Sequence, residues 1–237
     1  MEDKNVLVIG GSSGIGLEMV KTLSAQNCNP YVGSRTADAL ATLPGVRHIR
    51  LDVTQDSLEL DDLPPELHGL AYCPGTIRLR PFQRLGRNEF LEDFRINLLG
   101  AVNVIQGCLP RLRKAKTGAS IVLFSTVAVQ TGMPFHASVA SAKGAVEGLT
   151  RALAAEFAPR IRVNAIAPSL TETPLAESLL STEDKRSAAA GRHPLGRIGS
   201  PRDIARLAVH LLSDNGSWIS GQIIHVDGGM GALRVFK

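Results

Sequence analysis

Short apolar runs alternate with longer segments of helical apolar spacing along the whole chain. Residues 6–9 form an apolar run closed by glycines, as expected of a buried strand, whereas Leu17, Val20 and Leu23 recur on one helical face. On this pattern we expect strands at 6–9, 31–34, 46–51, 68–72, 120–125, 161–166 and 222–226, and helices at 17–26, 87–114, 135–157 and 201–213.

This alternation predicts an α/β fold. Parallel neighbours in a sheet need crossover connections, so strands separated by helices favour a parallel sheet of about seven strands with helices on both faces. We expect one domain over residues 1–237. Residues 52–67 leave room only for a short helix, so one sheet edge should be thinly covered. The least regular stretch, about 169–197, is expected to be a lid or substrate loop.

Composition excludes several classes of function. Hydrophobic residues make up 44% of the chain, enough for a sizeable core, and aromatic residues only 4%. The formal net charge of +4 accompanies no nucleic-acid-binding motif, so we expect no nucleic-acid partner. No apolar stretch approaches the roughly 18 residues of a membrane span, and no signal segment is recognisable. Three widely spaced cysteines fit neither disulfides nor a metal site, and we expect a cytoplasmic protein.

A glycine-rich turn links the first strand to the first helix. Glycines allow a tight turn in which backbone N–H groups approach a diphosphate, and the helix N-terminus adds the positive end of its dipole. The placement between an apolar strand and an amphipathic helix favours phosphate binding over a merely structural turn. The residues expected to hold the diphosphate are Gly10, Ser12, Ser13, Gly14, Ile15 and Gly16.

The glycine spacing G-x-x-x-G-x-G resembles that of the short-chain dehydrogenase/reductase family. Further segments carry the resemblance across essentially the whole chain: Leu51-Asp52-Val53, Arg95-Ile96-Asn97-Leu98, 162–168, 194–197 and 221–229. The resemblance implies a Rossmann-like, doubly wound sheet that binds a nicotinamide dinucleotide. It also implies cofactor contacts by Asp52 and Val53 at the adenine and by Gly75, Pro168, Thr171 and Thr173 toward the nicotinamide.

The end of the second predicted strand favours NADP(H) over NAD(H). An acidic residue at this place binds the ribose hydroxyls, whereas an arginine accepts a 2′-phosphate. The chain has Ser34 and Arg35 there, and no acid before Asp38. Arg35 can pair with the phosphate in a bidentate manner and Ser34 can add a hydroxyl. The alternative is that Arg35 only stacks on adenine or caps the next helix.

The catalytic positions that the resemblance implies are incomplete. Lys143, Asn97 and the hydroxyl of Thr126 stand at the family's lysine, asparagine and serine positions, but Val139 stands where the proton-donating tyrosine is expected. A positioned general acid contributes about 10²–10⁴-fold to the rate, so ordinary carbonyl reduction should suffer by about that factor. Ser169 also replaces a glycine of the family's Pro-Gly-x-x-x-Thr turn, and we expect it to lie near Val139.

His136 is the candidate replacement for the missing acid. It precedes Lys143 by seven residues, or about two helical turns, which is the tyrosine spacing of enoyl reductases related to this family. An imidazole can donate a proton near neutral pH. Two alternatives remain: His136 is an ordinary residue at a helix start, or a water held by Asn97 and Lys143 is the donor.

Two functions follow from this site. The first is an NAD(P)-dependent oxidoreductase that transfers hydride to a small carbonyl or enone substrate with an altered proton donor. The second is a cofactor-binding pseudoenzyme that acts as a sensor or scaffold.

The helices 87–114 and 135–157 resemble the pair through which family members assemble, and small residues would let them approach closely. We therefore expect a homotetramer or homodimer, with Ala140, Ala145, Gly148 and Ala152 at the contact.

Overall fold

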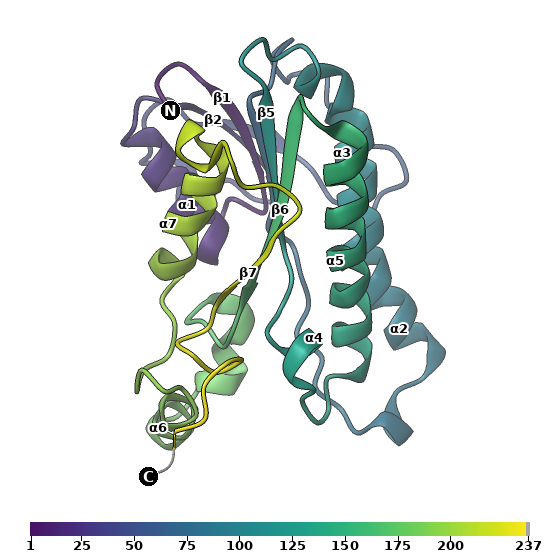
Figure 1. Ribbon diagram of the computed structural model, residues 1–237, viewed down its shortest axis with the longest axis vertical. Helices are drawn as coiled ribbons and strands as arrows, with labels where there is room; N and C mark the ends of the chain where they lie inside the picture. Colours follow the sequence, from purple (N-terminus) through teal and green to yellow (C-terminus); the bar gives the residue numbers. More distant parts are fainter. Residues whose placement is uncertain (236–237) are drawn as a thin grey trace.

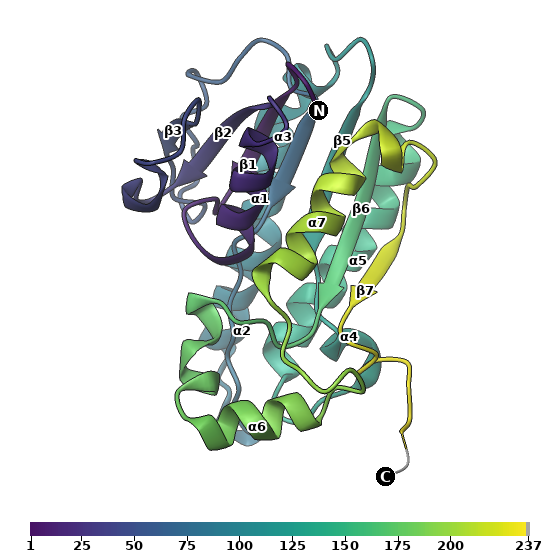
Figure 2. The same cartoon turned by 90° about the vertical axis from the view of Figure 1, so that its left-hand side faces the viewer.

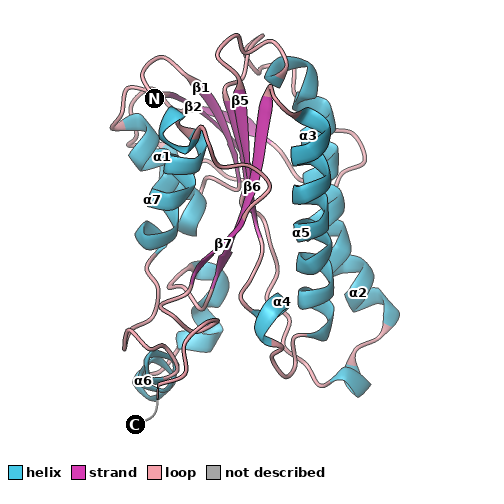
Figure 3. Ribbon diagram, viewed as in Figure 1, coloured by secondary structure: helices cyan, strands magenta, loops and turns pink. Residues whose placement is uncertain are grey.

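A seven-stranded parallel sheet forms the centre of the computed structural model, which describes residues 1–235 (Figures 1 and 3). The strand order is β3-β2-β1-β4-β5-β6-β7, so the winding reverses between β1 and β4. In such sheets ligands bind beyond the carboxyl ends of the strands at the reversal. The strands are β1 (Asn5–Ile9), β2 (Asn29–Ser34), β3 (Arg47–Arg50), β4 (Gly69–Tyr72), β5 (Ala119–Phe124), β6 (Ile161–Pro168) and β7 (Ile223–Val226).

Helices cover both faces of the sheet. α1 (Gly14–Ser24) and α7 (Pro201–Leu212) lie on one face, and α3 (Gly100–Leu112) and α5 (Ala137–Phe157) lie on the other (Figure 1). The remaining α-helices are α2 (Arg87–Phe94), α4 (Ala128–Thr131) and α6 (Glu183–Gly191), and short 3₁₀ turns span Asp38–Leu40, Phe82–Arg84, Pro174–Leu180 and Asp214–Gly216. Within residues 1–235, no helix combines the length and apolarity needed to cross a bilayer.

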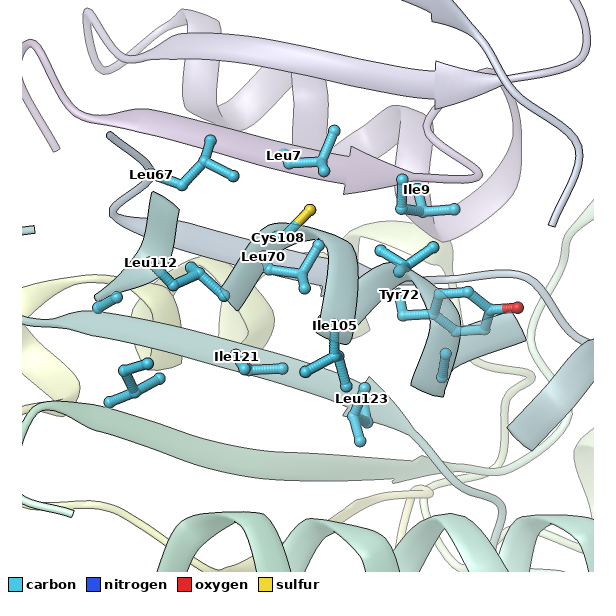
Figure 4. Close-up of a cluster of buried hydrophobic side chains, with 14 of the residues drawn as sticks. Leu7, Ile9, Leu67, Leu70, Tyr72, Ile105, Cys108, Leu112, Ile121 and Leu123 are labelled. Carbon is cyan, nitrogen blue, oxygen red and sulfur yellow. The ribbon is translucent and has the colours of Figure 1, made fainter. Parts of the chain in front are cut away.

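Alternate residues of the strands build two separate cores. Leu7 and Ile9 point toward α3, whereas Val6 and Val8 point toward α1 and α7, as the two-residue period of a strand requires. Figure 4 shows the first core, where Ile105 of α3 packs among strand residues. Both faces of the central strands are therefore buried, which explains their uninterrupted aliphatic runs.

The expected strands and α/β class are confirmed. The helix expected at 17–26 spans Gly14–Ser24 instead, and two longer helices differ in their details. The expected helix 87–114 ends at Leu112 and contains a π-turn at Arg95–Leu99, which divides it into α2 and α3. The expected helix 135–157 begins at Ala137, because Phe135 takes a left-handed conformation with φ +69° that a continuing helix cannot accommodate.

Two connecting segments correct the sequence prediction. Between residues 52 and 67 no helix forms; the segment is a series of turns from which Leu60, Leu63 and Leu67 reach into the core. The stretch 169–197, expected to be irregular, contains the 3₁₀ turn Pro174–Leu180 and α6, which pack together through a small apolar cluster of their own (Figure 2). Leu180 and Ala189 of this cluster are buried, so local apolar contacts make the stretch regular.

Candidate active site

A cleft lies beyond the carboxyl ends of the strands and has two connected halves. One half is lined by the glycine turn and the end of β2, and the other by β5, α5 and the segment that follows β6. α6 and the 3₁₀ turn before it lie beyond these strand ends (Figure 2). The residues that line both halves are Ile15, Cys73, Gly75, Thr173 and Leu175.

The glycine turn leaves room for a diphosphate where side chains cannot stand. Gly10 and Gly14 have φ values of +75° and +51°, which favour glycine. A Cβ on Gly16 would lie 2.4 Å from the carbonyl oxygen of Gly10, and a Cβ on Gly14 would lie 3.2 Å from Thr173 Cγ2. α1 begins at Gly14, so its unpaired N–H groups face the cleft. This geometry fits the phosphates of a dinucleotide.

Arg35 and Ser34 differ in their availability at the end of β2. Both line the cleft, but Ser34 is buried and its hydroxyl donates to the Thr36 carbonyl oxygen at 2.7 Å, beside His48 Nε2 at 3.0 Å. Because that hydrogen is already used, Ser34 stabilises the turn. Of the two side chains, the exposed Arg35 is the one that can reach a ligand at this end of the cleft.

Asp52 supplies an ionised acceptor in the same half of the cleft. Thr54 donates its backbone N–H at 2.9 Å and its hydroxyl at 2.8 Å to Asp52 Oδ1. These bonds, with smaller help from nearby Arg35 and Arg95, hold the pKa of Asp52 below its ordinary 3.8. Asp52 and Val53 line the cleft as expected of adenine-contacting residues.

Lys143 is the central charged group of the other half. Its Nζ donates to the Phe124 carbonyl oxygen at 2.8 Å, and the residue is only 7% exposed. Burial lowers the pKa of Lys143 from 10.5 to about 8, with Cys73 and Asp93 acting in the opposite direction. At neutral pH the ammonium group therefore remains mostly charged and can bind hydroxyl groups in the cleft.

Asn97 lies beneath the cleft, in the π-turn between α2 and α3, which is a common setting for functional residues. Its amide nitrogen donates to Thr76 Oγ1 and to the Asp93 carbonyl oxygen, both at 2.8 Å. Within residues 1–235 its buried Oδ1 has no partner. A Cβ on Gly75 would lie 3.2 Å from this oxygen and 3.3 Å from Lys143 Nζ. The gap between the two polar groups suits a water or a ligand hydroxyl.

Asp93, which the sequence analysis missed, orients the side chains of Thr76 and Asn97. Its fully buried carboxylate accepts hydrogen bonds from Thr76 at 2.7 Å and from Ser138 at 2.5 Å. Thr76 is thereby fixed as the acceptor for Asn97. An aspartate one helical turn before Asn97 is the only sign of this in the sequence, and its burial could not be inferred from spacing alone.

Beside these polar groups, the apolar side chain of Val139 forms part of the cleft wall. This side chain is 6% exposed and lines the cleft with Lys143. Ser125 donates to the buried Glu147 at 2.6 Å, so its hydrogen is not free for a substrate. Thr126 accepts a 3.3 Å bond from the Ala128 N–H, which leaves its hydroxyl hydrogen available to the pocket.

Comparisons with known proteins agree with this geometry. A family model described as enoyl-(acyl carrier protein) reductase matches residues 10–231. The 3-oxoacyl-(acyl-carrier-protein) reductase FabG of Thermotoga maritima is 34% identical over 245 residues, which cover 97% of this chain and 98% of the relative. The L-xylulose reductase of Bos taurus is 32% identical over 235 residues, with 95% and 96% covered.

The chain belongs to the short-chain dehydrogenase/reductase family. The ligand-free aldohexose dehydrogenase of Thermoplasma acidophilum has the same fold, with a TM-score of 0.88 and 25% identity over 100% of this chain and 97% of that one. As a short-chain dehydrogenase/reductase, the protein is an oxidoreductase that uses a nicotinamide cofactor, and the glycine turn and cleft fit that group.

The short-chain dehydrogenase/reductase site brings together nearly all the expected residues. Those that line the half of the cleft at the glycine turn are Gly10, Ser12, Ser13, Gly14, Ile15, Gly16, Ser34, Arg35, Asp52, Val53 and Gly75. Those in the other half are Thr126, His136, Lys143, Pro168, Thr171 and Thr173, and both Val139 and Ser169 lie on its wall. Asn97 lies just beneath the cleft.

His136 lines the pocket as the N-cap residue of α5. Its Nδ1 lies 2.8 Å from the Pro134 carbonyl oxygen, which can only accept, so Nδ1 carries the ring hydrogen. The Nε2 of a neutral His136 ring then has no hydrogen to give. In this geometry His136 can donate a proton from Nε2 only as an imidazolium ion.

A second histidine in the pocket was missed by the sequence analysis. His193 follows α6 and is 4% exposed; its Nε2 lies 2.9 Å from Ser169 Oγ and its Nδ1 lies 2.8 Å from the Ala189 carbonyl oxygen. The serine in place of glycine at residue 169 was the available signal. His193 lies 24 residues further along the chain, and only the folding of 169–197 brings the two together.

Proposed function

We propose that this short-chain dehydrogenase/reductase transfers hydride between NAD(P)H and a small carbonyl or enone substrate, with a proton donor other than tyrosine. The observation that carries the proposal is the buried Lys143 next to the unpaired oxygen of Asn97, across a space that only a glycine leaves open. A protein that merely bound a nucleotide would need neither the unpaired oxygen of Asn97 nor the mostly apolar second half of the cleft. The bound cofactor supplies the hydride.

The chain's own residues divide the work in this proposal. The glycine turn binds the diphosphate, Lys143 binds the ribose, and Thr126 polarises the substrate oxygen. The wall around them is mostly apolar and includes Leu79, Leu170 and Met230, so a substrate with apolar substituents fits best. The family model's description and the two relatives' names, an oxoacyl reductase and a xylulose reductase, support both C=C and C=O reduction.

NADP(H) is the proposed cofactor, in preference to NAD(H). Arg35 is the cationic side chain on the cleft wall at the end of β2, where an NAD-selective site would have an acid. Its guanidinium is exposed and can pair with a 2′-phosphate in a fork geometry.

A panel of enones, quinones and diketones with NADPH tests the function. We expect NADPH oxidation with at least one of them, and the proposal fails if none reacts although the protein binds NADPH. His136→Ala and Thr126→Val then separate the roles. If His136→Ala alone loses about 100-fold in kcat and its NADPH affinity stays constant, His136 is the proton donor to the substrate. Retained activity would remove it from the mechanism.

A cofactor-binding pseudoenzyme is the second candidate, and Val139 is the observation that favours it, since valine cannot exchange a proton. NADPH binding without turnover on any of these substrates would support a sensor or scaffold.

We also propose a cytoplasmic homotetramer. Support for the assembly comes from α5, where Gly148 and Ala152 are exposed and a Cβ on Gly148 would meet no atom within 4 Å. A second copy could therefore approach this face closely. Light scattering that gave a monomer mass at micromolar concentration would contradict the proposal.

A further inference from the structure

Among the hydroxyls that line the substrate half of the cleft, Ser169 is distinguished by its partner. Ser169 Oγ lies 2.9 Å from the Nε2 of His193. The other hydroxyls of this wall have no imidazole partner within residues 1–235, and four of them donate to carbonyl or carboxylate oxygens: Thr76, Ser125, Thr171 and Thr173. If Ser169 gives its hydroxyl proton to a ligand, the neighbouring imidazole of His193 can therefore supply another.

The ring of His193 is fixed in one orientation. The Ala189 carbonyl oxygen can only accept a hydrogen bond, so Nδ1 carries the hydrogen in that 2.8 Å contact. In the neutral ring Nε2 then accepts from the Ser169 hydroxyl. In the protonated ring Nε2–H donates to Ser169 Oγ, and the serine hydrogen is free to point into the pocket. With a protonated His193 ring the pair can therefore give a proton to a ligand, and with a neutral ring it can accept one.

The surroundings of His193 stabilise this arrangement. The turn at Gly228 packs against the ring, since a Cβ on this glycine would lie 3.5 Å from His193 Cδ2. Several titratable and charged groups belong to the elements around the ring: Glu183, Asp184, Lys185, Arg186 and Arg192 of α6 and its end, Glu172, His225 and Asp227. His136, Cys73 and Lys143 lie on the cleft wall that the ring shares. Asp227 is already bonded to the N–H groups of Gly229 and Gly231.

We propose that Ser169 and His193 form the proton-transfer pair of this active site, with Ser169 as the catalytic residue and His193 as the positioning residue that supplies its proton. The inference rests on the proposed function, and the substrate class is a ketone with apolar substituents. Hydride adds to the carbonyl carbon, and the π electron pair moves to the oxygen. Ser169 donates its proton to that oxygen and takes the Nε2 proton of His193. The alcohol leaves, and a proton taken up from the solvent restores the imidazolium ion of His193.

Kinetics of the variants Ser169→Ala, Ser169→Thr and His193→Gln test the pair, with the exposed His210→Gln as a matched control. In the wild type, kcat for ketone reduction by NADPH should fall as the pH rises, because the transfer starts from the protonated imidazole of His193. Ser169→Ala and His193→Gln should lose about 100-fold in kcat on the acidic side of this transition, and His193→Gln should also lose the pH dependence. Ser169→Thr should keep most of the rate. NADPH affinity, followed by fluorescence, should stay unchanged in all four variants.

A measurement without cofactor is independent of turnover. In ¹H–¹⁵N NMR spectra of the free protein, the neutral ring of His193 should carry its hydrogen on Nδ1, and Ser169→Ala should shift the Nε2 resonance. An Nε2–H tautomer would overturn the proposal, as would a His193→Gln variant that keeps the rate and the pH profile of the wild type. Wild-type protein that binds NADPH but reduces no substrate would overturn the proposed function itself, and the pair's role with it.

Discussion

Replacing Lys143 by methionine should make the cofactor-free protein more stable and inactive. The folded protein buries the ammonium group of Lys143 and thereby lowers the pKa of this lysine from 10.5 to about 8. At about 1.36 kcal/mol for each pH unit, keeping this charge costs the folded state about 3 kcal/mol at neutral pH. Methionine removes the charge at similar length but leaves the Phe124 carbonyl oxygen unpaired, which costs about 1–2 kcal/mol. The net expected gain is therefore about 1–2 kcal/mol.

The sign of the pH dependence follows from the two pKa values. Below about pH 8 the lysine is protonated in the folded and the unfolded chain alike, so the full cost is present. Between pH 8 and about 10.5 the folded protein has already lost this proton while the unfolded chain keeps it, and the cost disappears as the pH rises. The advantage of Lys143→Met should thus shrink toward high pH.

Urea unfolding of wild type and variant at about pH 7 and pH 10 measures this difference. Comparison at one pH cancels the contributions of groups that do not interact with Lys143, such as Cys28 and Cys108, whose burial raises their pKa values. Lys21→Met, at an exposed lysine of α1, is the matched control and should change little. A variant less stable than wild type at pH 7, or an advantage that does not shrink at pH 10, would refute the reasoning.

Three further variants test other parts of the site. Arg35→Asp should weaken NADPH binding by about 10–100-fold and leave NADH binding nearly unchanged, as titrations with both nucleotides would show, whereas the exposed Arg206→Asp should alter neither. In a Ser169→Ala background, which lacks the proposed proton donor, Val139→Tyr should raise ketone reduction by up to about 10²–10⁴-fold in steady-state assays, and an equal effect of Val139→Phe would disprove a role for the hydroxyl. Gly16→Ala places a methyl group 2.4 Å from a backbone oxygen of the turn and should abolish dinucleotide binding in calorimetry. Gly191→Ala, at an exposed position with open space around it, is the control.

The fold was predictable because the sheet is buried on both faces. Aliphatic runs such as 119–124 can only be interior strands when helical segments separate them, and all seven expected strands form. The ends of the helices depended on the backbone conformation of single residues, which the apolar pattern of the sequence does not reveal. The left-handed Phe135 delays the start of α5, and the π-turn around Asn97 interrupts a helix whose apolar spacing is continuous.

The site was predictable where chemistry lies in local spacing. The glycine turn and the lysine at residue 143 follow from short motifs whose geometry one strand and one helix impose. Contacts between distant segments could not be predicted. The buried Asp93 meets Ser138 across 45 residues, and His193 meets Ser169 only because α6 packs on the turn before it. The hydrogen bonds of the Ser34 hydroxyl to Thr36 and His48 could not be predicted either, because they depend on the position of His48 on the neighbouring strand.

Titration of the purified protein with NADPH and NADH, followed by nucleotide fluorescence, tests the central claim most directly. The glycine turn, Arg35 and Lys143 line one continuous cleft, so both nucleotides should bind and NADPH should bind more tightly. The absence of any response to either nucleotide would contradict the account at its foundation, because every later step requires a nicotinamide ring beside Lys143.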